Sequence, residues 1–259
     1  MNAFGYWREL QLASRDRADR LDPSIERARW RTLAGAYDRN ALHTSAPEFA
    51  RRVAEEIQTG ESVLEIGPGT GGFTVPVAAR ASRVLAVDLS EAMLGVLRDR
   101  LDAGRVRNVE LRQGEWPEVG VEPHEVVLAV NSLYRVLDIR RCIERMTAAA
   151  RRGVIVGWSV GHNPPVLPSL VDPAGPRRYR PGVTYIHLLL ALHELGITAE
   201  VEVHRVPRLV WRASYDDAAE KLLGVPDPTD DERQRAADLA RQWFAPDGNG
   251  VVHRYEGQV

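Results

Sequence analysis

An acid followed by closely spaced glycines is the part of this sequence best suited to chemistry. Residues 63–66 are apolar apart from Glu65, and Gly67, Gly69 and Gly71 follow at once. Glycine adopts left-handed backbone angles without a steric cost and lets a ligand approach the backbone closely. An apolar run that ends in such a loop predicts a strand, a turn that binds a nucleotide, and a helix.

Asp88 is a second candidate, because it closes the next apolar run. Dinucleotide-binding folds place an acid roughly 20 residues after the loop, where it accepts hydrogen bonds from the ribose hydroxyls. Gly67, Gly69 and Gly72 also satisfy their G-x-G-x-x-G pattern. Asp88 fits any ligand that contains adenosine, so it does not distinguish a dinucleotide from another adenosine cofactor. It could instead cap the following helix, as could Ser90.

Glu65 favours a cationic ligand, because a carboxylate at this position would repel a pyrophosphate. S-adenosylmethionine carries a sulfonium and an amino group. The Glu-x-Gly-x-Gly-x-Gly run from Glu65 to Gly71 resembles motif I of the class I methyltransferases, and residues 88–94 resemble their second-strand signature. The resemblance implies S-adenosylmethionine as the cofactor. Glu65 would then orient its amino group, the glycines would shape the backbone near its methionine portion, and Asp88 would take its ribose hydroxyls.

The resemblance also implies which residues lie near the adenine. Gly114-Glu115-Trp116 is similar to the family's third-strand segment, where a side chain commonly faces the adenine. We therefore expect Glu115 and Trp116 at the adenine edge. Leu89 and Met93 would flank the ring, although an apolar pair four residues apart on a helix also fits core packing.

Residues near the reacting atoms are less clearly marked. Asn131 and Tyr134 follow an apolar strand and invite comparison with the N-x-P-Y element of amine-methylating enzymes, including rRNA adenine dimethylases, but the proline is missing. We expect both to line the pocket and Asn131 also to contact the cofactor. His162 is the acid–base candidate, because histidine titrates near neutral pH. Tyr179 and Tyr185 could offer ring faces to the sulfonium or to the substrate.

Arginine supplies nearly all of the positive charge, since Lys221 is the only lysine among 34 basic residues. We interpret this as a composition bias and give it no functional meaning. Individual arginines can still form bidentate pairs with carboxylates or phosphates. Arg135 is therefore expected either to bind a substrate carboxylate or to pair with Asp138 on the surface.

Strand and helix patterns alternate from residue 61 to about residue 160, which predicts an α/β fold with a doubly wound, mostly parallel sheet. The expected strands are 62–66, 83–88, 108–112, 125–130 and 153–158, and the expected helices are 72–80, 90–102 and 138–150. The resemblance implies seven strands that end in an antiparallel pair, for which 199–206 and 251–259 are the candidates. Ligands bind at the carboxyl ends of such strands, which would gather Glu65, Asp88, Glu115 and Asn131.

Helices are expected on either side of this pattern. Residues 1–59 would form an N-terminal helical cap with helices near 6–13, 25–37 and 47–58, the last capped by Ser45. Its aromatic residues would either roof the pocket or seal the cap to the domain: Trp7, Trp30 and Tyr37. Residues 60–259 would form the catalytic domain, with a proline-rich lid at 161–181, a helix at 182–195 and a helical insertion at 212–246 that holds helices 214–224 and 229–245.

The bulk composition restricts the partners. A formal net charge of −2 over 259 residues argues against the positive surface that nucleic-acid binding requires. No stretch approaches the roughly 18 apolar residues of a membrane span, and the N-terminus lacks a signal-peptide layout, so a cytoplasmic protein is expected. Cys142 is the only cysteine, which excludes an intrachain disulfide and a thiolate metal cluster. We expect a small-molecule substrate, no nucleic-acid, membrane or metal partner, and a monomer or homodimer.

The leading hypothesis is a small-molecule methyltransferase that acts on an oxygen or nitrogen nucleophile by in-line transfer. A second hypothesis keeps the cofactor but has the aminocarboxypropyl carbon attacked, either by an external group or by cyclisation to azetidine-2-carboxylate with release of methylthioadenosine. An extended pocket favours methyl transfer, whereas a sealed pocket lined by Asn131, Tyr179 and Tyr185 favours cyclisation. A non-catalytic binding protein and a nicotinamide-dependent oxidoreductase remain as alternatives.

Overall fold

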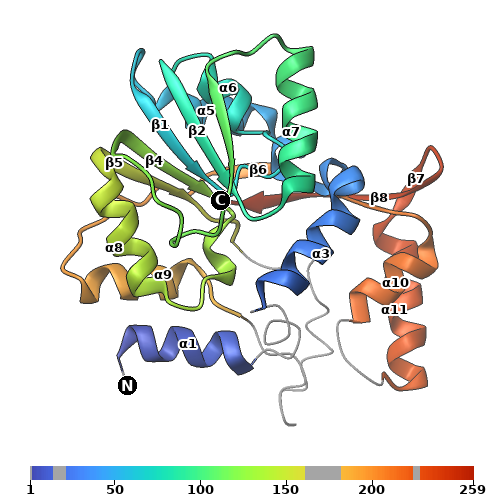
Figure 1. The fold of residues 1–259 in the computed structure, drawn as a ribbon. Coiled ribbons are helices and arrows are strands. Elements are labelled where there is room, and N and C mark those ends of the chain that lie inside the picture. The colour runs from blue at the N-terminus through green and yellow to red at the C-terminus, as the bar shows by residue number, and fades with distance from the viewer. Residues whose placement is uncertain (1, 14–21, 161–181, 224–227) are drawn as a thin grey trace.

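The central element is a five-stranded parallel sheet. The computed structural model describes residues 2–13, 22–160, 182–223 and 228–259. Its strands lie in the order β3-β2-β1-β4-β5 (Figure 1). They are β1 (Ser62–Ile66), β2 (Arg83–Asp88), β3 (Val109–Gln113), β4 (His124–Val130) and β5 (Ala150–Gly157). All five were predicted, to within three residues at each end. The strand order reverses between β1 and β4, which creates the crevice where ligands bind in such folds.

Helices cover both faces of this sheet (Figure 1). One apolar cluster joins β1, β2 and β4 to α5 (Pro47–Glu55) and α6 (Thr74–Ala78), and a second joins Ala86 of β2 to α7 (Glu91–Ala103). On the other face, alternate residues of the same strands pack against α8 (Ile139–Ala149), α9 (Tyr185–Glu194) and Trp7 of α1 (Ala3–Ala13). Because side chains alternate across a strand, each strand feeds both layers. This double covering explains why every residue of β1 is buried.

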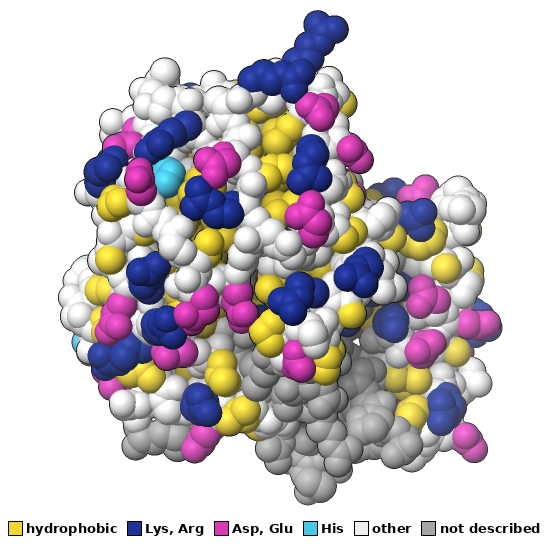
Figure 2. All heavy atoms as spheres, in the orientation of Figure 1, with side chains coloured by type: hydrophobic (Ala, Val, Ile, Leu, Met, Phe, Trp, Pro, Cys, Tyr) yellow, Lys and Arg dark blue, Asp and Glu magenta, His cyan; other side chains and the backbone are white. Residues whose placement is uncertain are grey.

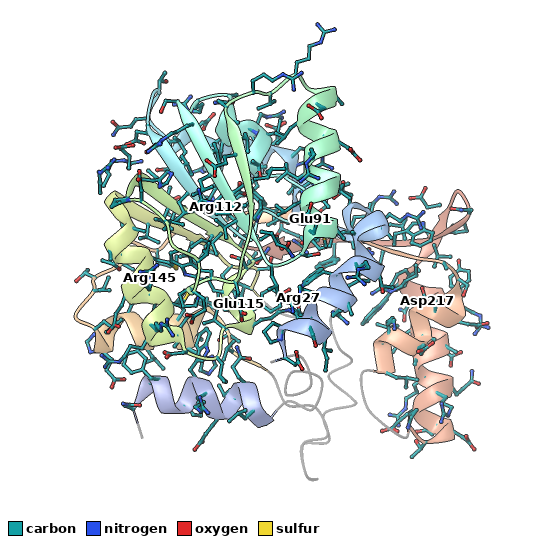
Figure 3. The ribbon with its side chains drawn as sticks, in the orientation of Figure 1. Arg27, Glu91, Arg112, Glu115, Arg145 and Asp217 are labelled. Carbon is teal, nitrogen blue, oxygen red and sulfur yellow. The ribbon has the colours of Figure 1, made fainter. Side chains whose placement is uncertain are left out.

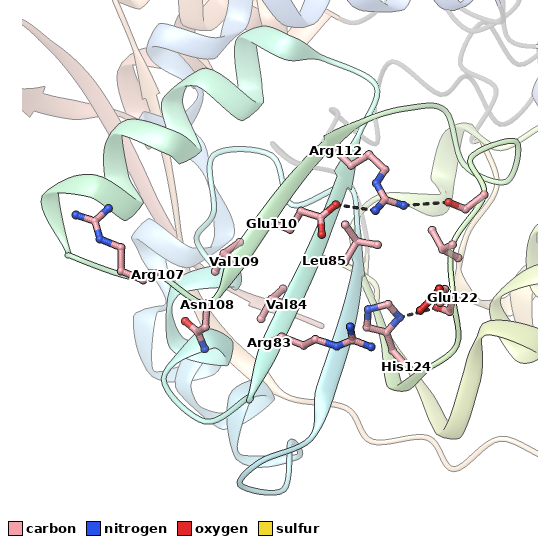
Figure 4. Close-up of a pocket in the computed structure, with 12 residues that line it drawn as sticks. Arg83, Val84, Leu85, Arg107, Asn108, Val109, Glu110, Arg112, Glu122 and His124 are labelled. Atoms are coloured by element: carbon pink, nitrogen blue, oxygen red, sulfur yellow. Dashed lines mark hydrogen bonds and ion pairs between the residues drawn. The ribbon is translucent and has the colours of Figure 1, made fainter.

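Residues 114–123 connect β3 to β4 without a helix, which leaves part of the β2–β3 face uncovered. An open cavity of about 790 Å³ lies there, lined by Leu85, Val109, Arg112 and His124 among others (Figure 4). Figure 2 shows apolar side chains among charged ones on this side of the molecule. Arg112 bonds Glu110 and the carbonyl of Gly120. None of the predicted site residues lines this cavity.

The C-terminal strands differ from the prediction. We expected them to extend one seven-stranded sheet, but β6 (Arg205–Arg212), β8 (Gly250–Gln258) and β7 (Ala245–Asp247) form a separate antiparallel sheet in that order. A single bridge between Val160 and Gln258 joins strand β8 to the end of the parallel sheet.

The strand expected at 199–206 was also wrong, since β6 begins only at Arg205. Residues 201–204 alternate without a layer to cover them, and Val201 and Val203 are more than half exposed. The eight residues of β6 instead pair along the whole of their length with β8. Alternation therefore predicted an extended segment but could not identify its partner.

The remaining helices come from the C-terminal and N-terminal parts of the chain. Helices α10 (Tyr215–Leu223) and α11 (Asp230–Trp243) pack on the small sheet, and Thr229 caps α11. The N-terminal helix expected at 25–37 is divided into α3 (Pro23–Leu33) and the 3₁₀ helix η2 (Ala34–Asn40), followed by α4 (Leu42–Ser45). Ser45 does not cap α5, because its hydroxyl donates back to carbonyls of its own turn.

Gly71 tests the glycine loop, because its φ is +88° and a Cβ there would overlap the buried side chain of Leu97. We expect Gly71→Ala to lower the free energy of unfolding by about 2–4 kcal/mol, from backbone strain and overpacking together. Gly95 is the matched control: it lies in α7, where a Cβ meets nothing. Gly95→Ala is expected to stabilise the protein by about 0.5–1 kcal/mol. Urea unfolding measures the stability of both variants. An unchanged stability of the Gly71 variant would contradict the claim that this position requires glycine.

Candidate functional site

A cavity of about 1040 Å³ lies at the carboxyl ends of β1 to β4. Helix α3 and η2 line one side of it, the turn after β4 lines another, and β6 contributes the inward face of the small sheet. Cavities for small molecules measure about 300–1,000 Å³, so this one has room for a nucleotide-sized ligand and a second small molecule.

The structure brings most of the predicted residues to this cavity. Those that line it are Glu65, Gly67, Gly69, Asp88, Leu89, Met93, Glu115, Trp116, Asn131 and Tyr134. Gly71 does not line it and packs against α7 instead. His162 and Tyr179 lie outside the described residues, as does the proposed lid at 161–181. Tyr185 begins α9 and does not line the cavity.

The glycine loop is held open by its backbone geometry. Gly67 and Gly69 have φ values of +67° and +58°, which residues with a Cβ rarely adopt. A Cβ on Gly67 would come within 2.5 Å of the Ser132 side chain, so the close approach of β1 and β4 requires glycine. A Cβ on Gly69 would meet only the ring of Tyr37, at 3.8 Å, so the loop faces Tyr37 at this point of the cavity.

Asp88 fastens the loop to the end of β2. Its carboxylate accepts hydrogen bonds from the backbone N–H groups of Gly69 (3.1 Å) and Ser90 (2.9 Å). Burial raises the pKa of Asp88, although these bonds act in the opposite direction. The helix cap is Ser90, whose hydroxyl accepts from the N–H of Met93. The carboxylate of Asp88 is therefore not used as the cap of α7 and faces the cavity.

Glu65 is the most unusual charge in the site. It lies inside β1, its side chain is only 3% exposed, and Oε2 is buried without a hydrogen-bond partner. Burial, together with the negative charge of Asp88, raises the pKa of Glu65 to about 7, against the opposing effect of the Thr74 hydroxyl. A buried carboxylate with one oxygen left without a partner is costly, so Glu65 is retained at the expense of stability. A cation placed in the cavity would supply the missing partner.

Asn131 adopts a strained backbone conformation, with a φ of +50°. Its side-chain amide accepts a hydrogen bond from the N–H of Ser159 (2.8 Å) and donates one to the Ser159 hydroxyl (3.0 Å). The residue thereby links the ends of β4 and β5. Strain of this kind is concentrated at functional sites. Leu133 stands where the N-x-P-Y element has proline, and its side chain is buried in the core.

The N-terminal segment is attached to the glycine loop through Asp38. Its carboxylate accepts a hydrogen bond from the hydroxyl of Thr70 (2.5 Å) and pairs with Arg100 of α7. His43 lies 3.2 Å from the same carboxylate and packs against Gly72, where a Cβ would overlap it. Burial lowers the pKa of His43. Together these contacts hold η2 and α4 over the cavity.

The aromatic residues of this segment have two different roles. Trp7 is fully buried and donates to the carbonyl of Val136 (2.6 Å), so it seals the N-terminus to the domain. Trp30 and Tyr37 contact each other edge-on at 5.7 Å and line the cavity. Trp7 therefore seals the N-terminal segment to the domain, whereas the pocket-roofing role of Trp30 and Tyr37 stays a prediction.

The alternative that paired Arg135 with Asp138 was wrong. The guanidinium of Arg135 pairs with Glu26 of α3 at 2.7 Å, whereas Asp138 caps α8. The arginine also lies over the rings of Trp30 and Tyr134, at 5.4 and 5.0 Å. Glu26 is more than 100 positions away in sequence, which local spacing could not indicate.

The expected adenine neighbours are arranged side by side in the cavity wall. Met93 is buried at the start of α7, and Leu89 is half-buried in the turn before it. Glu115 follows β3 and is exposed at the rim (Figure 3). Trp116 lines the cavity and also packs against the core beneath α8, and its contact with the adenine stays a prediction.

Several cavity residues were not predicted. Arg208 and Arg212 enter from β6, and Leu42 and His43 from α4. The alternation of Val206, Arg208, Val210 and Arg212 on one strand face was the available signal, but it lay beyond the strand we expected. Cys142 is buried, and burial raises the pKa of its thiol to about 12.

A family model described as a methyltransferase domain matches residues 63–153, which contain the glycine loop, Asp88 and Asn131. The chain carries a class I S-adenosylmethionine-dependent methyltransferase domain. The resemblance inferred from Glu65 to Gly71 is therefore confirmed, and S-adenosylmethionine is the methyl donor of this family.

Among the described residues, no helix has the length and apolar character that a membrane crossing requires.

Curated relatives match the methyltransferase domain in part. A probable ribosomal RNA small subunit methyltransferase A of Methanosarcina acetivorans is 43% identical over 77 residues, 30% of this chain and 28% of that protein. An uncharacterized protein of Haemophilus influenzae is 33% identical over 150 residues, 57% of this chain and 55% of that protein. Magnesium-protoporphyrin O-methyltransferase of Rhodobacter capsulatus is 30% identical over 99 residues, 38% of this chain and 44% of that protein. The chain thus spans at most 55% of the length of these three.

Solved structures share the fold over more of the chain. A SAM dependent methyltransferase from Aquifex aeolicus has a TM-score of 0.53 at 16% identity and covers 68% of this chain and 92% of its own. Magnesium protoporphyrin IX methyltransferase from Synechocystis PCC 6803, with bound SAH, has a TM-score of 0.50 at 18% identity and covers 71% and 93%. At these identities the likeness shows the fold alone.

Replacing Glu65 by glutamine is expected to stabilise the ligand-free protein at neutral and alkaline pH. The carboxyl is protonated in both states below 4.5, its unfolded value, whereas above about 7 folding must bury its charge. The wild-type protein should therefore lose up to about 3 kcal/mol of stability as the pH rises through this window. Urea unfolding of both proteins from pH 4.5 to 8 measures the difference. An equal pH dependence in Glu65→Gln would contradict the account.

Proposed function

We propose that this protein transfers a methyl group from S-adenosylmethionine to an oxygen or nitrogen atom of a small molecule. The observation that carries the proposal is the buried carboxylate of Glu65, with one oxygen left without a partner, beside a glycine loop that lines the cavity at Gly67 and Gly69. A cationic amino acid portion suits this position, whereas a pyrophosphate would be repelled. The proposal therefore favours S-adenosylmethionine over a nicotinamide cofactor.

The residues present fit the cofactor. In the proposed arrangement Glu65 orients the amino group, directly or through water, and the Asp88 carboxylate accepts hydrogen bonds from the ribose hydroxyls. Leu89, Met93 and Trp116 form the apolar wall for the adenine. Bound S-adenosylmethionine supplies an electrophilic methyl group on a sulfonium.

The remaining work is positioning and exclusion of water. Methyl transfer is an in-line displacement, so the protein must hold two reactants in alignment and desolvate them. We assign this to the turn at Asn131 and Tyr134, which the Ser159 contacts fix in place, and to Trp30 and Tyr37 on the opposite wall. His162 and Tyr179 stay predictions for the acid–base and ring-face roles.

The shape of the cavity favours methyl transfer over cyclisation. A volume of about 1040 Å³ exceeds the need of the cofactor alone, and Tyr185 does not line it. Methylation of ribosomal RNA receives less support, although relatives with that name match part of the chain. The net charge of −2 and Leu133 in place of the N-x-P-Y proline both argue for a small acceptor.

Product analysis by mass spectrometry tests the proposed reaction. Purified protein is incubated with S-adenosylmethionine alone and then with a pooled extract of small metabolites. We expect S-adenosylhomocysteine to accumulate only when the extract is present, because the second reactant is external. Methylthioadenosine formed without any extract would replace methyl transfer by cyclisation.

Asp88→Asn is expected to weaken S-adenosylhomocysteine binding about tenfold or more, because charge-assisted hydrogen bonds to the ribose are lost. The matched control is Glu91→Gln, which changes an exposed acid three residues further on that pairs with Arg98 (Figure 3). Titration calorimetry measures both affinities, and urea unfolding checks that both variants fold. Equal affinities of the two variants would remove Asp88 from the ribose site.

A further inference from the structure

Strand β6 turns one of its faces toward the cavity. Side chains alternate across a strand, and Arg208, Val210 and Arg212 share the face that lines the cavity. Val206, on the same face, is buried in the main core. The guanidinium groups of Arg208 and Arg212 therefore reach the cavity from the C-terminal sheet, two residues before and two residues after the buried Val210.

Arg208 is buried without full compensation of its charge. It is 7% exposed, and its Nη1 atom is buried without a hydrogen-bond partner. The guanidinium bonds Tyr255 of β8 and lowers the pKa of that phenol, against the larger opposing effect of burial. No carboxylate among the described residues forms an ion pair with Arg208. Unpaired buried charges are rare in folded proteins, because each carries a desolvation cost.

Arg212, four residues further along the strand, is half-buried and also has an unpartnered nitrogen. Its Nη1 donates to the carbonyl of Trp211 (2.9 Å), while its Nε is buried without a partner. Burial lowers the pKa of Arg212, against the opposing charge of Asp217. Within the described parts of the chain it too lacks an ion pair with a carboxylate.

Other charged residues of the cavity are placed differently from Arg208 and Arg212. Arg135 already has Glu26 as its partner at 2.7 Å, so its charge is neutralised within the protein. The acids at the strand ends, Glu65 and Asp88, belong to the proposed cofactor side. Tyr37 lies where the charges of Asp88 and Arg208 both act on its phenol. The cavity thus has an acidic side at the sheet and a basic side at β6.

We propose that the acceptor molecule carries a carboxylate or phosphate group that Arg208 and Arg212 bind. The inference rests on the proposed function, since it names the substrate class for the same cavity. Guanidinium groups bind such anions through paired N–H donors, and the two unpartnered nitrogens are donors of this type. The anion would fix the acceptor against β6 and leave its nucleophilic atom directed toward the cofactor side.

The test measures anion binding to the protein saturated with S-adenosylhomocysteine. The probes are benzoate and inorganic phosphate, with neutral benzamide as the matched control, and chemical shifts in NMR titrations report the affinity. We expect benzoate or phosphate to bind and benzamide not to. Arg208→Gln and Arg212→Gln should each weaken that binding about tenfold or more. Arg205→Gln is the control variant, because Arg205 is exposed on the same strand and pairs with Glu256.

Two further arms separate the possible outcomes. The two glutamine variants should bind S-adenosylhomocysteine with the same affinity as the wild type. A tenfold loss of this affinity would mean that the arginines bind the cofactor's own carboxylate. That result would overturn the proposal. Failure of the saturated wild type to bind either anion would overturn it as well. Failure of the wild type to bind S-adenosylhomocysteine at all would instead refute the proposed function. If Arg208→Gln does not fold, Arg208→Lys keeps the charge but loses the planar donor pair and should give a smaller weakening.

Discussion

A carboxylate buried inside the central strand is the constraint on which the rest of the site depends. Glu65 occupies a position that burial on both faces of the sheet would normally give to an apolar residue. Its unpartnered oxygen stores an unfavourable interaction that a cationic ligand can relieve. In the proposed function, the stability that this oxygen costs the free protein is recovered when the cofactor binds.

The surrounding elements form the walls of the cavity that Glu65 lines. Asp88 ties the glycine loop to β2, and Asp38 ties η2 to Thr70 of the loop and to α7. The Glu26–Arg135 pair joins α3 to the turn after β4. Segments from the N-terminus, the parallel sheet and β6 therefore meet at one cavity, although the chain visits them in distant parts of its sequence.

The sequence predicted the parts of this arrangement that local patterns determine. The bounds of β1 and β2 agree with the prediction because each is a short apolar run ended by loop residues, and the carboxyl-end rule for parallel strands then placed Glu65 and Asp88 together. Contacts between distant segments were beyond such patterns. Arg208 reaches the site only because β6 pairs with β8, and the arginine-rich composition hid its significance. For Gly71 the motif predicted a residue of the binding loop, but the glycine is needed for packing against α7 and does not line the cavity.

Proton release on cofactor binding tests the central role of Glu65 most directly. Calorimetric titration with S-adenosylhomocysteine, in buffers of different ionisation enthalpy, counts the protons exchanged. With a pKa near 7 in the free protein, Glu65 is largely protonated at pH 6.5 and must ionise as it meets the ligand's amino group. The account predicts proton release at pH 6.5, much less at pH 8.5, and none attributable to this site in Glu65→Gln. Binding without proton release at pH 6.5, or with the same release in the variant, would contradict it.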